Sequence, residues 1–271
     1  MFFLKYETIV ERICLKPGVD GTVSNPFKDD VEAKRYGQYR PRYHDIPMQL
    51  IRNYIGDTLE NALDVACGTG HSTQALSKIV KRVSGCDSSE SMLSEAREKF
   101  DFEFVCAAAE NLPFAQASFD LVNISMGFHW VEQEKFLNEA KRILKTDGFL
   151  IIDNYGFKGI VSSDPRKQGM HTQLMQDHLP PATEKDRYPT KQLAQQAGWN
   201  LATEFNYEHQ VSFDAAAFSN FIMTWSHFQA LKSEDKKIVA ERIEQTYRDI
   251  FEEKMLELEF GGRAQIYRPS D

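Results

Sequence analysis

The chain has 271 residues, of which 42% are hydrophobic and 12% aromatic, and it carries a formal net charge of −8. These apolar side chains are ample for a large core, which excludes a wholly disordered chain. The acidic balance, without any block of lysines and arginines, disfavours binding to the phosphates of a nucleic acid, and no segment reaches the ~18 consecutive apolar residues of a membrane span.

The four cysteines form no CxxC pair, and three of them (Cys67, Cys86 and Cys106) lie in or beside predicted strands. Free, buried thiols of this kind are typical of a reducing compartment. We therefore expect a cytoplasmic protein, a monomer or weak dimer, with a small molecule as its partner and with no membrane or nucleic-acid contact.

The predicted elements follow an N-terminal extension over residues 1–24 and begin with a helix over residues 48–54. Strands and helices then alternate. Short apolar runs predict strands at residues 62–65, 82–86, 102–107, 119–125 and 149–153. Apolar side chains at helical spacing predict a helix that begins at residue 72 and helices over residues 89–100 and 131–144, the former with Ser88 or Ser89 as its N-cap. A turn at residues 146–148 is expected to end the last of these helices.

The second half of the chain follows a different pattern. Residues 156–189 are rich in Gly, Pro, Asp and Lys and are expected to form an irregular cap. An extended stretch near residues 203–213, two helical runs and a final strand at residues 262–267 follow.

Alternating strands and helices with continuous apolar strands predict an α/β fold, doubly wound and Rossmann-like, whose parallel sheet is covered on both faces. Such sheets bind ligands at the carboxyl ends of their strands. We expect a core with an N-terminal lid over residues 25–155, and we expect residues 156–271 to supply a helical cap and terminal strands that complete the same domain.

The segment after the first of these strands reads 62-ALDVACGTGHST-73. A phosphate-binding P-loop requires GxxxxGK[ST], and no lysine stands in place here. A dinucleotide fingerprint requires GxGxxG, and the third glycine is missing. The glycines therefore indicate close backbone approach to a ligand other than a pyrophosphate.

Two carboxylates end neighbouring strands. Asp64 ends the first strand and Asp87 ends the second, where a carboxylate can accept hydrogen bonds from both hydroxyls of a ribose. Two alternatives stay open: Asp87 could be an N-cap or turn residue before Ser88 and Ser89, and Asp64 could cap its own loop.

Four segments carry a resemblance to a known family: 62-ALDVACGTGHST-73, 86-CDSSESML-93, 107-AAAENLPFAQASFDLVNISMGFHW-130 and 139-EAKRILKTDGFLII-152. They resemble the class I S-adenosylmethionine-dependent methyltransferases of the small-molecule, type 11 kind. The resemblance implies a mostly parallel, seven-stranded sheet with an antiparallel last strand, and S-adenosyl-L-methionine as the cofactor. It implies cofactor contacts from Asp64, Ala66, Gly68, Gly70, Asp87, Met92, Ala108, Ala109 and Glu110.

Two positions depart from the family's pattern. Ala66 stands where many members have glycine, which suggests an unstrained backbone there. Ala108 stands where many members have an aspartate that binds the adenine amine, so that backbone, water or Glu110 must supply this contact. For Glu110 a solvated loop position is the alternative.

Two flanking segments, 35-RYGQYRPRYHDIP-47 and 218-FSNFIMTWSHFQALK-232, are similar to those of the trans-aconitate-type methyltransferases. The resemblance implies a lid that closes over the cofactor and a helix that lines the acceptor pocket. Tyr36 and Arg40 would then contact the cofactor, and Arg40 could alternatively pair with an acidic acceptor. The acceptor-side residues would be Tyr39, Tyr43, Trp130, Trp225 and Ser226, although simple packing of these aromatic side chains is the alternative.

His129 follows the fourth strand and is the candidate catalytic residue, as a general base or as an orienting hydrogen-bond partner, with a structural histidine as the alternative. The histidines form no convincing metal set. We expect methyl transfer to a small molecule, with a carboxylate among the acceptors considered. A methyltransferase acting on protein or nucleic acid, a nicotinamide-dependent oxidoreductase and a non-catalytic cofactor-binding protein stay open as alternatives.

Overall fold

The computed structural model describes residues 29–56, 59–162, 164–179, 187–252 and 254–270. The extension expected over residues 1–24 lies outside these ranges.

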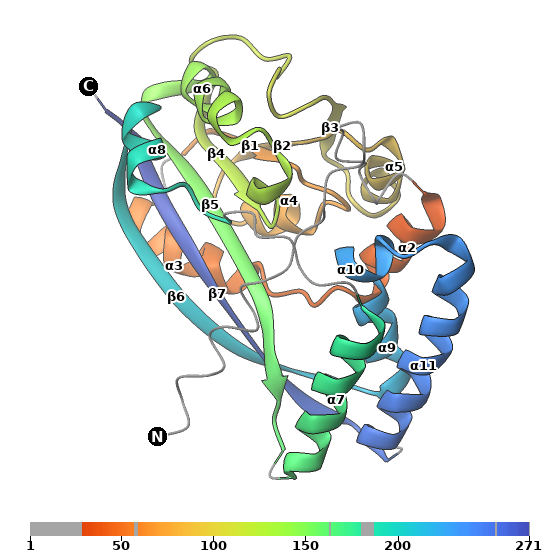
Figure 1. Cartoon of the computed structure of the whole chain (residues 1–271). Helices are drawn as coiled ribbons and strands as arrows, with labels where there is room; N and C mark the ends of the chain where they lie inside the picture. The colour runs from red at the N-terminus through yellow and green to blue at the C-terminus, as the bar shows by residue number, and fades with distance from the viewer. Residues whose placement is uncertain (1–28, 57–58, 163, 180–186, 253, 271) are drawn as a thin grey trace. The chain divides into compact units, whose positions relative to one another are not determined.

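A seven-stranded sheet forms in the spatial order β3-β2-β1-β4-β5-β7-β6 (Figure 1). β1 pairs in parallel with β2 and with β4, β2 pairs in parallel with β3, and β4 pairs in parallel with β5. The predicted fold class, a doubly wound and mostly parallel sheet with an antiparallel end, is therefore confirmed. The strands are β1 (Asn61–Val65), β2 (Arg82–Asp87), β3 (Glu103–Cys106), β4 (Phe119–Ser125), β5 (Leu144–Ile160), β6 (Trp199–Phe213) and β7 (Leu256–Pro269).

The helices begin and end where local chemistry favours it. In α5 the N-cap Ser89 accepts a hydrogen bond from the backbone of Met92, and Arg97 and Lys99 lie in the last turn, where cations complement the helix dipole. The helices of the described chain are α2 (Asp30–Tyr39), α3 (Asp45–Ile55), α4 (His71–Leu76), α5 (Glu90–Lys99), η2 (Phe128–Trp130), α6 (Gln133–Ile143), α7 (Pro165–His178), α8 (Lys191–Gln196), α9 (Ala215–Met223), α10 (Ser226–Gln229) and α11 (Ser233–Phe251).

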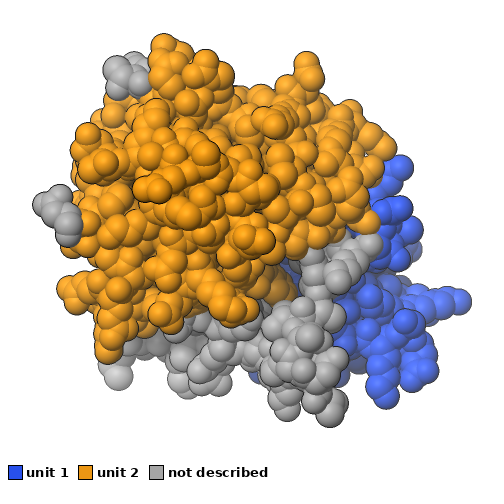
Figure 2. Space-filling view, turned by 90° about the horizontal axis from the view of Figure 1, so that it is seen from above, with its two compact units in different colours: residues 1–41, 156–185, 208–261 blue, residues 42–155, 186–207, 262–271 orange. Residues whose placement is uncertain are grey.

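The chain divides into two compact units, which Figure 2 colours separately. Unit 1 comprises residues 1–41, 156–185 and 208–261, and unit 2 comprises residues 42–155, 186–207 and 262–271. The domain boundaries expected from the sequence, at residues 24/25 and 155/156, stay predictions.

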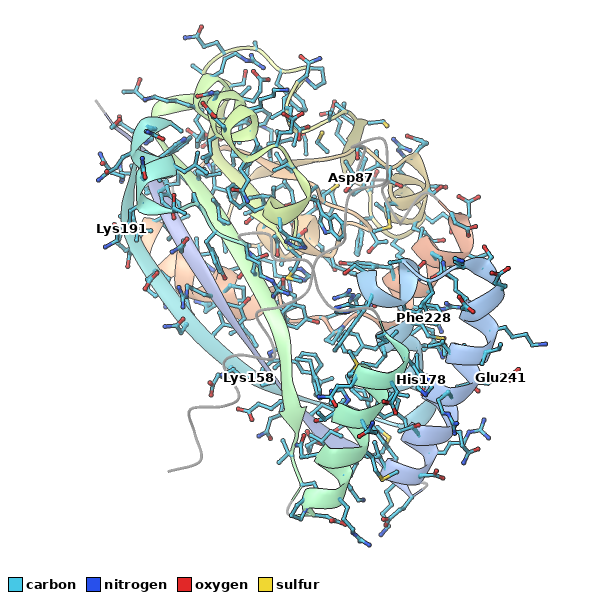
Figure 3. The ribbon with its side chains drawn as sticks, in the orientation of Figure 1. Asp87, Lys158, His178, Lys191, Phe228 and Glu241 are labelled. Carbon is cyan, nitrogen blue, oxygen red and sulfur yellow. The ribbon has the colours of Figure 1, made fainter. Side chains whose placement is uncertain are left out.

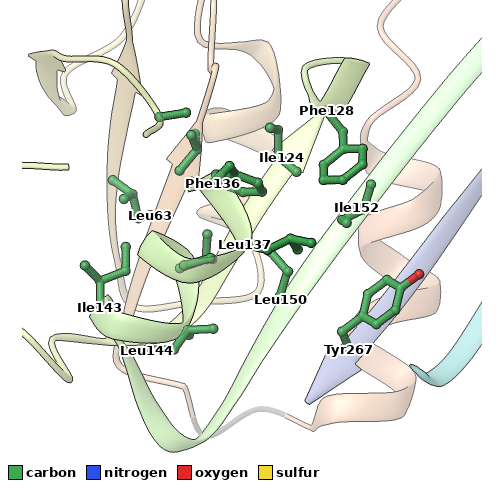
Figure 4. Packing of buried hydrophobic residues seen from close by; sticks show 14 of the residues in the cluster. Leu63, Ile124, Phe128, Phe136, Leu137, Ile143, Leu144, Leu150, Ile152 and Tyr267 are labelled. Atoms are coloured by element: carbon green, nitrogen blue, oxygen red, sulfur yellow. The ribbon is translucent and has the colours of Figure 1, made fainter. Parts of the chain in front are cut away.

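Unit 2 holds the parallel strands and the main hydrophobic core. Figure 1 shows α6 and α8 on one face of its sheet and α3 on the other. Leu150 and Ile152 of β5 are fully buried together with Phe136 and Leu137 of α6, and Figure 4 shows this packing. Burial on both faces explains why apolar side chains follow one another without alternation at residues 121–122 of β4 and 149–152 of β5.

Unit 1 is built around aromatic side chains. α9 contacts α2 and α11, and α11 also contacts α7. The ring of Phe218 in α9 lies 4.6 Å from that of Tyr247 in α11 and 5.3 Å from that of Phe157 in β5. Apolar packing between helices and strand ends therefore defines this unit.

Two expectations about the middle of the chain were wrong. The turn expected at residues 146–148 does not precede the fifth strand, because β5 already begins at Leu144. The irregular cap expected from residue 156 is in fact strand to Ile160 and then α7, which Asp164 caps and Pro165 opens. Buried Phe157 and Ile160 favour the extended strand over the loop that the glycines suggested.

Candidate functional site

The carboxyl ends of β1, β2 and β4 lie at one edge of the sheet in unit 2. Val65, at the end of β1, is in register with Cys86 of β2 and with Ile124 of β4. Ser125 of β4 is in register with Asp153 of β5. Residues that follow these strands are therefore brought together, as the ligand-binding rule for open α/β sheets predicts.

The glycine loop after β1 has a left-handed backbone at three positions. The φ angle is +53° at Ala66, +53° at Gly68 and +81° at Gly70. The unstrained backbone expected at Ala66 is therefore wrong, because alanine in this region costs about 1 kcal/mol. The side chain of Ala66 also packs against the turn after β4. A Cβ atom placed on Gly127 in that turn would lie 2.6 Å from the Cβ of Ala66.

The two glycines of the loop serve different purposes. A Cβ on Gly70 would lie 2.9 Å from the ring of Phe100 and 3.1 Å from that of Phe104, so packing onto α5 and β3 requires this glycine. A Cβ on Gly68 would lie 3.1 Å from the Cε of Met92. Met92 is buried on α5 and covers the loop at Gly68, which is compatible with its predicted place beside the cofactor.

Asp64 is fully buried and anchors the glycine loop by hydrogen bonds. One carboxylate oxygen accepts hydrogen bonds from Ser72 Oγ at 2.6 Å and from Thr73 Oγ1 at 2.7 Å, and the other accepts one from Asn123 Nδ2 at 2.7 Å. Burial raises the pKa of Asp64 to about 6, while the three hydrogen bonds oppose that rise. These bonds match the loop-capping alternative, and a direct cofactor contact from Asp64 stays a prediction.

Asp87, labelled in Figure 3, ends β2 beside the glycine loop. Its Oδ2 accepts a hydrogen bond from the backbone N–H of Gly68 at 2.9 Å, and its Oδ1 accepts one from the N–H of Ser89 at 2.8 Å. Desolvation raises the pKa of this half-buried carboxyl, and the backbone hydrogen bonds oppose the rise. The N–H of Ser88 acts in the same sense, and the four acceptor positions of the carboxylate still leave capacity for a ligand hydroxyl.

The segment after β3 contributes Ala108, which is exposed, and Ala109, which is buried. Glu110 Oε1 accepts a hydrogen bond from the backbone N–H of Glu132 at 2.6 Å. Because Glu132 is the N-cap residue of α6, Glu110 satisfies one of the amide groups at the start of this helix. The adenine contacts of these three residues stay predictions.

The turn after β4 carries the candidate catalytic residue. His129 lies in η2 and is 5% exposed, and its ring centroid is 5.1 Å from that of Trp130. Residue 126, the first after β4, has a left-handed backbone with φ of +56°. Two neighbouring strand ends, those of β1 and β4, thus both leave the sheet through a left-handed residue that is not glycine.

The lid residues belong to unit 1. Arg40 Nη2 donates a hydrogen bond to the carbonyl of Thr224 at 3.2 Å, and the guanidinium stacks on the rings of Tyr36 at 4.7 Å and Phe221 at 5.4 Å. Tyr39 ends α2, and Trp225 packs against Phe221 immediately before Ser226 opens α10. The cofactor and acceptor roles of Tyr36, Tyr39, Arg40, Trp225 and Ser226 stay predictions.

Tyr43, expected at the acceptor, is 1% exposed in unit 2. Its hydroxyl donates a hydrogen bond to Asp153 Oδ2 at 3.2 Å. Sequence reasoning missed Asp153, and it also missed Asn123, the partner of Asp64. One signal was available for both residues, namely a polar side chain inside or ending an otherwise apolar strand, at 119-FDLVNIS-125 and 149-FLIID-153.

The described residues contain no group of three or more His, Cys, Asp or Glu side chains placed to hold a metal ion. Among the helices that the structure describes, none is long and apolar enough to cross a membrane.

Comparison with solved structures identifies the fold. A methyltransferase of Anaeromyxobacter dehalogenans, titled as type II, superimposes with a TM-score of 0.63 at 20% sequence identity, over 85% of this chain and 98% of that one. A methyltransferase structure from Bacillus halodurans gives a TM-score of 0.51 at 19% identity, over 84% of this chain and 99% of that one. The fold is thus that of the class I methyltransferases.

Similarity to a known family model falls within unit 2. Residues 63–152 match the Methyltransf_11 family model, a methyltransferase domain. A Dictyostelium discoideum protein, named as a methyltransferase, is 30% identical over 132 residues, which are 49% of this chain and 50% of that protein. The ubiquinone/menaquinone biosynthesis C-methyltransferase UbiE of Campylobacter jejuni is 40% identical over 98 residues, which are 33% of this chain and 42% of that protein.

The chain spans about half or less of the length of these curated relatives. Residues 63–152 form a domain of the class I S-adenosylmethionine-dependent methyltransferases, and this recognition from the sequence is confirmed. The domain implies S-adenosyl-L-methionine as the methyl donor, as expected. The residues at the strand ends fit this group, since Asp87 keeps acceptor capacity for ribose hydroxyls and the loop lacks a side chain at Gly68.

Proposed function

We propose that this chain transfers a methyl group from S-adenosylmethionine to a small-molecule acceptor. The observation that carries the proposal is the pairing of Asp87 with the N–H of Gly68 at 2.9 Å, inside the matched methyltransferase domain. This pairing joins the end of β2 to the glycine loop of β1. A half-buried carboxylate at this position supports a ribose as the ligand, because it can accept hydrogen bonds from hydroxyl groups and would repel a phosphate.

The proposed cofactor site uses few side chains. Asp87 accepts hydrogen bonds from the ribose hydroxyls, and Met92 provides an apolar surface over Gly68. The N–H groups of Cys67, Gly68 and Gly70 are bonded to Cys86, Asp87 and Cys67, and these bonds fix the shape of the loop. When bound, the cofactor supplies an electrophilic methyl group on a positively charged sulfur.

The chain's own part in the reaction is orientation and exclusion of water. In-line transfer requires the acceptor atom to be held roughly 3–3.5 Å from the methyl carbon. A carboxylate acceptor requires no base, and His129 would then only orient it. A hydroxyl or amine acceptor makes a base useful, and His129, buried beside Trp130 in the turn after β4, is the candidate.

Two acceptor chemistries have support. Arg40, which stacks on Tyr36 and Phe221, favours an acidic acceptor, and its Nε is buried without a hydrogen-bond partner among the described residues. The name of the Campylobacter relative, a C-methyltransferase of ubiquinone/menaquinone biosynthesis, favours methylation of a carbon atom in a quinone precursor. That match covers a third of this chain and 42% of that protein, so the acceptor of the relative is one candidate to be tested.

Titration calorimetry with S-adenosylmethionine and S-adenosylhomocysteine tests the cofactor assignment. We expect micromolar binding, and Asp87→Ala should weaken it at least tenfold, because a pair of charge-assisted hydrogen bonds contributes ~1.5–3 kcal/mol each. Asp101→Ala, which removes an exposed carboxylate from the loop before β3, is the matched control and should bind normally. No binding at millimolar cofactor would refute the proposed function.

An acceptor screen follows, with release of S-adenosylhomocysteine as the readout. Panels of small carboxylates, quinols, phenols and amines separate the acceptor classes. Turnover only with a peptide or nucleic acid would favour the macromolecular alternative. Cofactor binding without turnover on any panel would favour a binding protein without catalytic activity.

A further inference from the structure

A buried carboxylate in unit 2 lies outside the proposed cofactor contacts. Asp153 of β5 is fully buried, and its Oδ1 accepts a hydrogen bond from Tyr207 at 2.7 Å. Its Oδ2 accepts hydrogen bonds from Ser125 Oγ at 2.9 Å and from Tyr43 at 3.2 Å. The hydroxyls of Tyr43 and Ser125 also lie 2.9 Å apart. We refer to Asp153, Tyr43, Ser125 and Tyr207 as the Asp153 cluster.

The cluster holds a carboxylate by hydroxyl groups alone. Burial raises the pKa of Asp153 to about 6, and the three hydroxyls are the groups that oppose this rise. No ion pair to Asp153 forms among the residues that the structure describes. A site that only added stability would be as well filled by apolar side chains, so its polarity calls for another explanation.

The three donors come from segments far apart in the chain. Tyr43 precedes α3, Ser125 ends β4, and Tyr207 lies in β6. The ring of Tyr43 stacks on that of Tyr155 with centroids 3.7 Å apart. Tyr207 lies so close to the backbone of Gly262 in β7 that any Cβ there would overlap its ring. One carboxylate thus fixes two tyrosines against neighbouring strands.

The same residues lie where the chain passes between the two units. Unit 2 begins at Arg42, one residue before Tyr43, and the chain leaves it after Tyr155 and again after Tyr207. It returns at residue 186 and at Gly262. Tyr43, Asp153 and Tyr207 therefore lie beside three of the five points where the chain passes between the units.

The backbone beside Asp153 holds the turn after β4. The carbonyl of Asp153 accepts a hydrogen bond from the N–H of Met126 at 2.8 Å, and the N–H of Tyr155 donates to Met126 Sδ at 3.0 Å. Met126 has φ of +56°, a conformation that the surrounding structure must maintain for a residue with a long side chain. Ser125 bonds the carboxylate of Asp153, and Met126 bonds the backbone of Asp153 and Tyr155. The two residues at the start of this turn are therefore both fixed by β5.

The turn after β4 contacts the glycine loop. A Cβ on Gly127 would lie 2.6 Å from the Cβ of Ala66, which leaves no room for a side chain between the two loops. The carbonyl of Gly127 accepts a hydrogen bond from the N–H of Trp130 at 2.9 Å, which closes η2 around His129. A shift of Met126 would therefore move His129 and Trp130 relative to the glycine loop.

We propose that Asp153 is a positioning residue, which fixes the turn after β4 through its three hydroxyl partners and thereby sets the place of His129 and Trp130 against the glycine loop. The position of Trp130 does not depend on the proposed function, whereas the consequence for cofactor affinity rests on it. The test separates these two consequences.

The first measurement uses ¹⁹F NMR of the full chain labelled with 5-fluorotryptophan. The chain has three tryptophans, and the resonances of Trp130 and Trp199 are assigned with Trp→Phe variants. Trp199 lies in the core of the same unit, where its indole N–H donates to the carbonyl of Leu137, so it reports on the fold but not on the turn. Asp153→Asn and the milder Tyr43→Phe are the test variants.

The matched control is Tyr188→Phe. The hydroxyl of Tyr188 donates mainly to the backbone carbonyl of Arg263 at 2.7 Å, with that of Asn154 at 3.3 Å as a second acceptor, so it lies near the cluster without a hydrogen bond to Asp153. We expect both test variants to shift or broaden the Trp130 resonance and to leave that of Trp199 unchanged, and we expect Tyr188→Phe to change neither.

The second measurement is calorimetry with S-adenosylhomocysteine on the same proteins. We expect Asp153→Asn to weaken binding about tenfold, as loss of a buried hydrogen-bonded partner does, with Tyr188→Phe unchanged. A Trp130 resonance that is unaltered in both test variants would overturn the proposal, as would equal changes at Trp130 and Trp199. If the unmodified chain binds no cofactor, the proposed function fails while the resonances still decide the role of Asp153.

Discussion

Asp64 and Asp153 are two buried carboxylates in similar chemical environments. They differ in where along the chain their hydrogen-bond partners lie. Each is fully buried, each accepts hydrogen bonds from three side chains, and burial raises the pKa of each to about 6. The partners of Asp64 include Ser72 and Thr73, eight and nine residues further along the chain. The partners of Asp153 are 28, 54 and 110 residues away.

The difference separates two tasks. Two of the three donors to Asp64 lie at the start of α4 and the third, Asn123, lies on the paired strand β4, so Asp64 mainly stabilises the glycine loop. Asp153 bonds Ser125 on its paired strand and also joins Tyr43 and Tyr207, where the chain passes between the units. A local carboxylate can therefore be replaced at the cost of one loop, whereas loss of the distant one should disturb several segments at once.

The largest expected effect comes from removal of either carboxylate. Asp64→Ala and Asp153→Ala each leave three buried donors without their acceptor, and each should lower the free energy of unfolding by about 4 kcal/mol, at ~1–3 kcal/mol per unsatisfied group. Urea denaturation followed by circular dichroism measures the loss. Asp101→Ala, at an exposed loop position, should change the midpoint little.

Hydrogen exchange on the same two variants distinguishes local from distributed loss. Asp64→Ala should increase exchange mainly in the glycine loop and α4, whereas Asp153→Ala should increase it near residues 43, 126 and 207. The same exchange pattern in both variants would contradict this distinction.

The next effect is the dependence of stability on pH. A carboxyl whose pKa is raised from 3.8 to about 6 is protonated more readily in the folded state. Its contribution is therefore complete below pH ~4 and is lost as the pH rises through ~6, by up to about 3 kcal/mol per group. Asp64→Asn removes one titrating group, so the stability of the unmodified chain relative to this variant should fall between pH 4 and 7.

Denaturation midpoints at several pH values for the unmodified chain, Asp64→Asn and Asp153→Asn measure this linkage. Since the two carboxyls share no partner, the two slopes should be similar and additive in the double variant. If the stability of the unmodified chain relative to either Asn variant rose with pH, the predicted direction of the pH dependence would be wrong.

The smallest effect concerns the strained backbone beside Asp64. Ala66→Gly should raise the free energy of unfolding by about 0.5–1 kcal/mol, because relief of the left-handed alanine outweighs the added entropy of the unfolded chain. Ala75→Gly, the same exchange inside α4, should instead lower it by about 1 kcal/mol. Thermal unfolding of both variants provides the comparison, and destabilisation by Ala66→Gly would mean that its methyl packing against Gly127 matters more than the strain.

The features that could be predicted from the sequence are those with local causes. Periodic apolar runs located β1, β2, β4 and α6, and the N-cap preference of serine located the start of α5. The proximity of Asp87 to the glycine loop followed from the rule that parallel strands present their carboxyl ends at one edge.

The features that could not be predicted depend on distant partners or on backbone angles. The meeting of Ser125 and Asp153 follows from the pairing of β4 with β5, but no spacing along the chain indicates that residues 43 and 207 join them. The left-handed angle of Ala66 was missed because residue type is only an indirect guide to conformation, and here the adjoining loop at Gly127 imposes it. The extension of β5 beyond residue 153 was missed because its pairing partner, β7, comes about a hundred residues later.

The close approach of Tyr207 to Gly262 has a consequence for how this sequence can vary. A side chain at position 262 would displace the Tyr207 ring and break its bond to Asp153, so the two positions should change together during divergence. Relatives with any larger residue at 262 should have a small residue at 207 and a different partner for the buried carboxylate. The structural defect caused by a substitution at 262 should be rescued by a second substitution, to a smaller residue, at 207.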